Sequence, residues 1–282
     1  VHARHGHADE LIDHNRSRLF VSTGGVFNET MQRTSRTLCL TTLFFAAGAA
    51  LFFTKAAVIP YKVAYPVLLL SLSLFYLRLK PLIPVGAALL LSAVGDAAGA
   101  GGMFIPQMLF FALAHGAYMC YFLPQAQVAP RPFVWPVLTA LLLFLFVCIV
   151  PRAADPAERA GVAVYGLVIA GMLYSALQYR GAYAAWFRLA ALLFVFSDSV
   201  IAWGRFVEPV PCRTYVVMIT YYAAQYLFYL FAVRATHGGT PAPEILSADV
   251  LAIYCGKTHR RQRGRLSDSK PFSACIYNPP RS

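Results

Sequence analysis

The chain has 282 residues, of which 59% are hydrophobic and only 13% are charged. Soluble globular domains carry about 25% charged residues, so this composition excludes an ordinary soluble enzyme, a disordered chain and a coiled coil. It indicates a polytopic membrane protein with a formal net charge of +12.

Residues 1–36 form a polar tail that contains His2, His5, His7 and His14. The tail lacks an apolar run, so it does not resemble a secretory signal peptide. Loosely spaced histidines in a polar segment are typical of a disordered tail, and a metal site there is the alternative. We predict a disordered tail and no metal site.

Eight apolar runs follow the tail, and each is close to the roughly 20 residues that a helix needs to cross a bilayer. Turn residues and charges separate the runs. Since backbone groups in lipid must pair within the chain, we predict an all-α fold, a polytopic membrane bundle of about eight transmembrane helices. The expected catalytic domain is 37–234, with spans at 37–54, 61–78, 82–101, 103–123, 133–150, 160–179, 185–206 and 214–234.

The basic C-terminal tail, 235–282, helps to choose the orientation of the bundle. With the N-terminus inside, eight basic residues flank the inner ends of the spans and six flank the outer ends. The basic run at 257–265 adds to this excess, so we expect cytoplasmic termini. The location would be the endoplasmic reticulum in a eukaryote or the inner or plasma membrane in a bacterium. The tail itself is expected to be disordered and solvated, or else to contact anionic lipid.

Two carboxylates lie inside predicted spans, Asp96 in 82–101 and Asp198 in 185–206. An acidic residue at the bilayer centre costs about 2.5–3.5 kcal/mol and is normally paired and functional. Both would lie about 20 Å from the inner end of their spans, so they could face one cavity. There they would share a proton, giving the acid and the base that hydrolysis needs. A hydrogen bond between helices is the structural alternative.

Other polar side chains recur on helical stripes. In 103–123 one face carries Gln107, Phe111, His115 and Tyr118, and in 214–234 one face carries Tyr221, Gln225 and Tyr229, with Tyr222 beside it. We expect these groups to line a cavity. Tyrosines that anchor a helix at the membrane interface are the alternative.

Three further polar residues lie close to the carboxylates or near span ends. Ser92 precedes Asp96 by one helical turn, within hydrogen-bonding reach. Arg205 and Lys62 are either snorkelling side chains or contacts to a phosphate. The candidate substrate-binding residues are therefore His115, Tyr118, Tyr221, Tyr222, Gln225, Ser92, Lys62 and Arg205.

Three segments of the sequence resemble a known family. They are Ser92-Ala93-Val94-Gly95-Asp96, the F-x-x-x-H-x-x-Y pattern from Phe111 to Tyr118, and a longer block that runs from Phe196-Ser197-Asp198 through Arg205-Phe206 and Pro209-Val210-Pro211 to Thr220-Tyr221-Tyr222-Ala223-Ala224-Gln225. In this order they are similar to the YhhN-type lysoplasmalogenase family of integral membrane proteins. The tails carry no part of the resemblance.

The resemblance implies an ether hydrolase that cleaves the vinyl ether bond of lysoplasmalogens. The products would be a fatty aldehyde and glycerophosphoethanolamine or glycerophosphocholine. Such a bond breaks by protonation of carbon and addition of water, so Asp96 and Asp198 would serve as acid and base, in either order, with no cofactor. The expected partners are a lysophospholipid and the bilayer, with no nucleic acid, and the oligomeric state is left open. A proton-coupled transporter or lipid-handling protein is the alternative function.

Overall fold

A computed structural model gives the fold, and it describes residues 31–54, 59, 61–126, 129 and 131–238. The named elements of this part are all helical. The long helices are Met31–Phe53, α2 (Tyr65–Leu77), α3 (Ile83–Ala100), α4 (Phe104–Phe122), α5 (Val134–Leu143), α6 (Pro156–Gln178), α7 (Ala184–Phe206) and α8 (Arg213–Gly238). A π-helical segment, Phe144–Ile149, continues α5, and short 3-10 turns lie at Lys80–Leu82, Leu123–Gln125 and Val150–Arg152.

The predicted all-α membrane fold is confirmed. Every expected apolar run in the described part forms a helix, in the predicted order. Six of these helices are long and apolar enough to cross a membrane, namely the N-terminal helix, α3, α5 with its continuation, α6, α7 and α8. With 13 residues α2 is shorter, and α4 is not among the six, so eight crossings remains a prediction.

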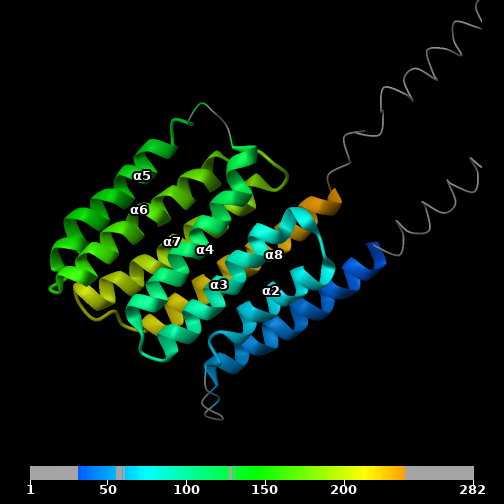
Figure 1. Ribbon diagram of the computed structural model, residues 1–282, viewed down its shortest axis with the longest axis horizontal. Helices are drawn as coiled ribbons and strands as arrows, with labels where there is room; N and C mark the ends of the chain where they lie inside the picture. Colours follow the sequence, from blue (N-terminus) through cyan, green and yellow to red (C-terminus); the bar gives the residue numbers. More distant parts are fainter. Residues whose placement is uncertain (1–30, 55–58, 60, 127–128, 130, 239–282) are drawn as a thin grey trace, which may run out of the picture. The chain divides into compact units, whose positions relative to one another are not determined.

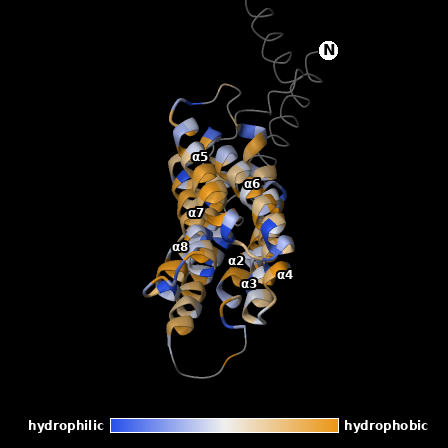
Figure 2. Cartoon of the chain, turned by 90° about the vertical axis from the view of Figure 1, so that its left-hand side faces the viewer, coloured by the Kyte–Doolittle hydropathy of each residue, from blue (hydrophilic) through white to orange (hydrophobic). Residues whose placement is uncertain are grey.

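Large apolar side chains point outward along several helices. Leu43, Leu109, Leu143, Val164 and Phe196 are each exposed. Figure 2 shows hydrophobic colouring over much of the helical ribbon. In water such a surface would be an association patch, whereas in a bilayer it is the face that lipid covers. The chain is therefore a multi-pass membrane protein.

Helix boundaries differ from the expected spans where polar residues belong to a helix. The chain is already helical at Met31, ahead of residue 37, because hydropathy marks the apolar length and not the helix end. Similarly α6 begins at Pro156, since the Asp155 side chain accepts a hydrogen bond from the Glu158 backbone N–H at 2.8 Å. Aspartate at the N-cap and proline in the first turn start a helix.

Residues 1–30 and 239–282 of the two predicted tails lie outside the described residues.

Two helical hairpins form the middle of the bundle. α3 packs against α4 in one hairpin, and α7 packs against α8 in the other. α3 also contacts α2 and α8, while α6 contacts both α4 and α7. In Figure 1, α5 (green) and the N-terminal helix (blue) lie on opposite sides, with the two hairpins between them. These contacts place α3, α4, α6, α7 and α8 around the interior of the bundle.

The close approach of α3 and α4 depends on two glycines one turn apart. A Cβ atom added to Gly95 would lie 3.0 Å from the ring of Phe111, and one added to Gly99 would lie 2.5 Å from the side chain of Gln107. Small residues spaced four apart let two helix backbones approach closely in a membrane. This contact brings the part of α3 that carries Asp96 close to α4.

Replacing Gly95 with leucine should separate α3 from α4. The added side chain meets the Phe111 ring and the Gln107 backbone, and overpacking of this kind costs about 1–3 kcal/mol. We expect the Gly95→Leu variant, purified in detergent, to unfold several degrees below the unaltered chain in a thermal melt. Gly116→Leu on α4 is the matched control, because nothing lies within 4 Å of a Cβ built there. Equal melting temperatures for the two variants would contradict the packing argument.

Candidate active site

The two intramembrane carboxylates line one cavity of about 280 Å³, here called the carboxylate cavity. Asp96 comes from α3 and is 6% exposed, and Asp198 comes from α7 with 13% of its side chain exposed. The other polar side chains in the wall are Gln107, Ser197 and Tyr221. Two acids from separate hairpins therefore meet in an otherwise largely apolar chamber.

A tyrosine hydroxyl holds each carboxylate through its Oδ2 atom. Tyr221 Oη on α8 donates to Asp96 Oδ2 at 2.7 Å. Tyr165 Oη on α6 donates to Asp198 Oδ2. Among the described residues neither Oδ1 atom is hydrogen-bonded, so one oxygen of each carboxyl group remains for a ligand or water.

His115 extends the hydrogen-bonded chain at Asp198. Its Nε2 atom lies 3.0 Å from Tyr165 Oη and 3.6 Å from Asp198 Oδ2. The tyrosine hydroxyl has one proton and gives it to the carboxylate, so His115 Nε2–H is the donor to Tyr165. The fully buried imidazole therefore orients Tyr165, and Tyr165 orients Asp198. Its Nδ1 atom is buried without a hydrogen-bond partner in the described part of the chain.

Aromatic rings fix the position of these polar groups. Phe194 contacts Tyr221 edge to face at 5.5 Å between ring centroids and contacts His115 at 4.7 Å. Phe111 packs on Tyr221 at 5.9 Å. Edge-to-face packing restricts ring rotation. The hydroxyl of Tyr221 is thereby directed at Asp96.

Tyr118 and Gln225, two of the predicted substrate-binding residues, pair with each other outside the carboxylate cavity. Tyr118 Oη donates to Gln225 Oε1 at 2.6 Å, and both side chains are fully buried. Neither residue lines the cavity. The pair bridges α4 and α8, one turn of α8 beyond Tyr221.

Tyr222, Lys62 and Ser92 also lie outside the cavity wall. Tyr222 Oη donates to the backbone oxygen of Val63 at 2.8 Å, and Lys62 Nζ donates to the backbone oxygen of Thr54 at 3.1 Å. The Ser92 hydroxyl is buried with no hydrogen-bond partner in the described residues, so the expected bond to Asp96 is not made. The Asp96 carboxyl group is instead held by Tyr221.

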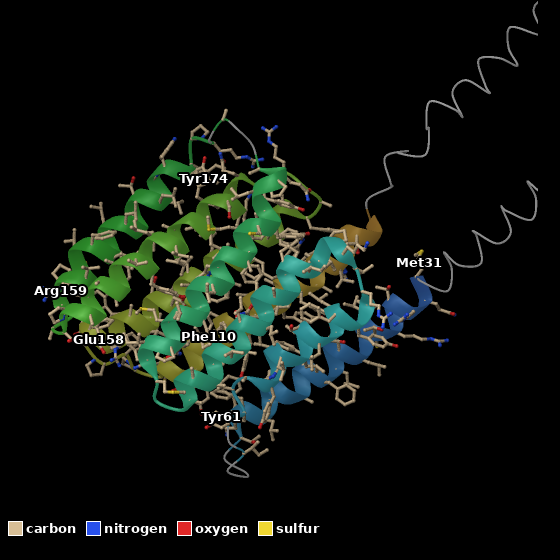
Figure 3. All side chains as sticks on the ribbon, viewed as in Figure 1. Met31, Tyr61, Phe110, Glu158, Arg159 and Tyr174 are labelled. Carbon is tan, nitrogen blue, oxygen red and sulfur yellow. The ribbon has the colours of Figure 1, made fainter. Side chains whose placement is uncertain are left out.

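Arg205 lies at the C-terminal end of α7 and lines two further cavities. Its Nη2 atom contacts Glu158 Oε1 at 2.5 Å, and its guanidinium carbon lies 3.7 Å from the centroid of the Phe104 ring. Figure 3 shows Glu158 at the end of α6 that faces away from Tyr174. Arg205 lines an apolar slot of about 70 Å³ that also contains Asp198 and Tyr165. It also lines a wider cavity of about 990 Å³, here called the mouth.

Two residues of the site were not on the list of predicted substrate contacts. Tyr165 belongs to no predicted polar stripe, and its contact with Asp198 depends on how α6 faces α7, which the sequence of α6 alone does not specify. With α6 beginning at Pro156, Tyr165 lies in the third turn, opposite Asp198. Gln107 belonged to the predicted polar stripe, and its role appears only in three dimensions, where it lines the carboxylate cavity, the slot and the mouth.

Comparison with known proteins adds an independent finding. A sequence model of the YhhN family matches residues 53–232, which include both carboxylates. The chain is 38% identical over 152 residues to lysoplasmalogenase TMEM86B of Homo sapiens, covering 52% of this chain and 62% of that protein. It is 36% identical over 153 residues to lysoplasmalogenase TMEM86B of Rattus norvegicus, covering 52% and 60%. The chain thus spans about three fifths of the length of these relatives. No solved structure matches it.

Thermal unfolding can test whether the Tyr118–Gln225 hydrogen bond stabilises the fold. Tyr118→Phe leaves Gln225 Oε1 buried without its donor, and an unsatisfied buried polar group costs about 1–3 kcal/mol. We expect Tyr118→Phe and Gln225→Leu each to lower the midpoint of thermal unfolding. The double variant should lose less than the sum, because it removes both partners together. Strictly additive losses would show that the two side chains are not coupled.

Proposed function

Since the chain belongs to the YhhN family, we propose that it is a membrane-embedded hydrolase of the vinyl ether bond of lysoplasmalogens. The products are a fatty aldehyde and glycerophosphoethanolamine or glycerophosphocholine. The observation that carries the proposal is the carboxylate cavity, where Asp96 and Asp198 meet inside the bundle. The names of the two TMEM86B relatives agree with it.

The proposed mechanism uses the two carboxyl groups as acid and base. The protonated aspartate donates its proton to the β-carbon of the vinyl ether, and an oxocarbenium ion forms. The ionised aspartate stabilises this cation and takes a proton from the water that adds to the α-carbon. In the collapse of the hemiacetal, the aspartate that took the proton from water gives it to the glycerol oxygen, which leaves as an alcohol. The aspartate that first acted as the acid accepts the hemiacetal hydroxyl proton, so the aldehyde forms and both carboxyl groups return to their starting states. Either Asp96 or Asp198 can begin as the acid.

The tyrosines keep the carboxyl groups in place for these steps. Tyr221 and Tyr165 occupy the Oδ2 atoms, so proton transfer falls to the Oδ1 atoms. Positioned groups accelerate a reaction because no reorganisation is needed at the transition state. Of the other predicted substrate-binding residues, His115 acts here through Tyr165, while Tyr118, Tyr222 and Gln225 maintain the packing around the cavity.

The surrounding cavities suit a lipid with a single chain. The apolar slot opens beside Asp198, so the first carbons of the chain can lie there while the vinyl ether faces the acids. The bilayer supplies the substrate. We also assign both termini to the cytoplasmic side, because the basic residues at the inner helix ends and in 257–265 outnumber those at the outer ends. The membrane is the endoplasmic reticulum in a eukaryote, or the inner or plasma membrane in a bacterium.

Removing either carboxylate should abolish aldehyde release. Purified Asp96→Asn and Asp198→Asn variants, given lysoplasmenylethanolamine, should lose at least a factor of about 10² in rate, the usual contribution of a positioned acid or base. Glu208→Gln is the matched control, since this exposed carboxylate lies in the α7–α8 connection and its Oε1 atom accepts from Trp203. Wild-type rates in both aspartate variants would refute the mechanism. No aldehyde from folded, unaltered chain would refute the function.

Tyr165 should affect the rate by positioning Asp198, although it does not itself react with the substrate. Tyr165→Phe removes the donor to Asp198 and frees the carboxylate to rotate, so we expect kcat to fall about tenfold to a hundredfold, the range for a charge-assisted hydrogen bond. KM should change little. Tyr174→Phe, on the same helix and remote from the cavity, should leave both constants unchanged. A Tyr165→Phe variant with normal kcat would exclude the positioning role.

A further inference from the structure

The mouth lies where the α3–α4 and α7–α8 connections meet. Its wall includes Gly102 from the first connection and Pro209 and Cys212 from the second. Gln107 and Ile201 belong to both the mouth and the carboxylate cavity. A molecule can therefore occupy the mouth and reach the carboxylates at the same time.

The charged side chains in the wall of the mouth are both basic. Arg205 and Arg213 are the charged residues in its wall, and no carboxylate lines it among the described residues. Only Nη2 of the Arg205 guanidinium is hydrogen-bonded in the described part, to Glu158, which leaves its other N–H groups available. Arg213 makes no ion pair there. Arg213 and the remaining N–H donors of Arg205, whose charge is shared with Glu158, favour an anionic ligand.

Backbone geometry adds to this preference. α8 begins at Arg213, so the N-terminal end of a 26-residue helix faces the mouth, and Thr214 and Tyr215 of its first turn also line the wall. Helix N-termini attract anions because their N–H groups and the helix dipole point outward. The Arg213 side chain crosses over Gly204, where an added Cβ would lie 2.8 Å from Arg213 Cδ. The absence of a side chain at Gly204 leaves room for the Arg213 side chain beside α7, next to the residue that precedes Arg205.

From this arrangement we infer that the mouth is the binding site for the phosphate of a lysophospholipid head group, held between Arg205 and Arg213. The inference rests on the proposed function for the identity of the lipid. Arg205 follows Asp198 by seven residues, which is two helical turns on the same face and about 10 Å along the axis. A long arginine side chain that reaches back covers part of this distance. One glycerol unit, which separates the phosphate from the vinyl ether, covers the rest.

The test measures binding with a probe that this chemistry does not cleave. Radiolabelled acyl lysophosphatidylethanolamine, which has an ester in place of the vinyl ether, is titrated onto the purified full chain in detergent. We expect Arg205→Gln and Arg213→Gln each to weaken binding about tenfold to a hundredfold, as for loss of one charge-assisted contact. A monoacylglycerol with the same chain has no phosphate and should bind all variants equally. Arg159→Gln, whose guanidinium contacts the Ala153 backbone oxygen, is the control and should bind both probes normally.

Three outcomes would overturn the inference. Unchanged affinity for the lysophospholipid in both arginine variants would show that the mouth does not hold the phosphate. An equal loss for the monoacylglycerol would show that the arginines act through folding, and Arg213→Gln guards against this because Arg213 makes no ion pair in the described residues. Displacement of the probe by inorganic phosphate at comparable concentration would show a site for free anions. A chain that binds the probe through both arginines yet releases no aldehyde would refute the hydrolase and leave the phosphate site intact.

Discussion

A carboxyl group enclosed by apolar helices must find its hydrogen-bond donors within the protein, because the hydrocarbon region offers no water to replace them. In this chain each aspartate takes a tyrosine hydroxyl from another helix. Tyr221 on α8 holds Asp96 on α3, and Tyr165 on α6 holds Asp198 on α7. The two bonds connect four helices around one cavity. These two hydrogen bonds therefore tie the arrangement of the four helices to the geometry of the cavity.

Around this centre, the polarity of the three cavities changes in the order in which the parts of an amphiphile do, from apolar chain to charged head group. The apolar slot, the carboxylate cavity and the cationic mouth adjoin one another, and Gln107 lies in the wall of all three. α3 can pass close to α4 at this point because Gly99 has no side chain to meet Gln107. A glycine contact that serves helix packing thus also leaves room for the amide at the junction. Gly204 acts in the same way, because the absence of its side chain leaves room for the Arg213 side chain beside α7.

Much of the fold could be predicted because run length and apolar composition are local properties. Asp96 and Asp198 were identifiable because charged residues are so rare in the spans. The partners of these acids depend on how helices distant in sequence face one another, which a stripe on one helix cannot specify. Tyr118 and His115 share a stripe on α4, yet His115 contacts Tyr165 while Tyr118 turns to Gln225. Ser92 lies one turn from Asp96 without bonding to it, since Tyr221 is the donor.

The two tyrosine contacts also differ in when they can form during synthesis. Tyr165 precedes Asp198 by 33 residues, so α6 is already made when α7 leaves the ribosome, and the two can enter the membrane as partners. Tyr221 follows Asp96 by 125 residues, so α3 must insert long before its donor exists. Inserting an acidic residue costs about 2.5–3.5 kcal/mol, and at that stage the apolar leucines, valines and alanines of α3 alone must offset it. The apolar composition of that helix is thus a requirement of biogenesis as well as of the finished bundle, and α8 completes the chamber last.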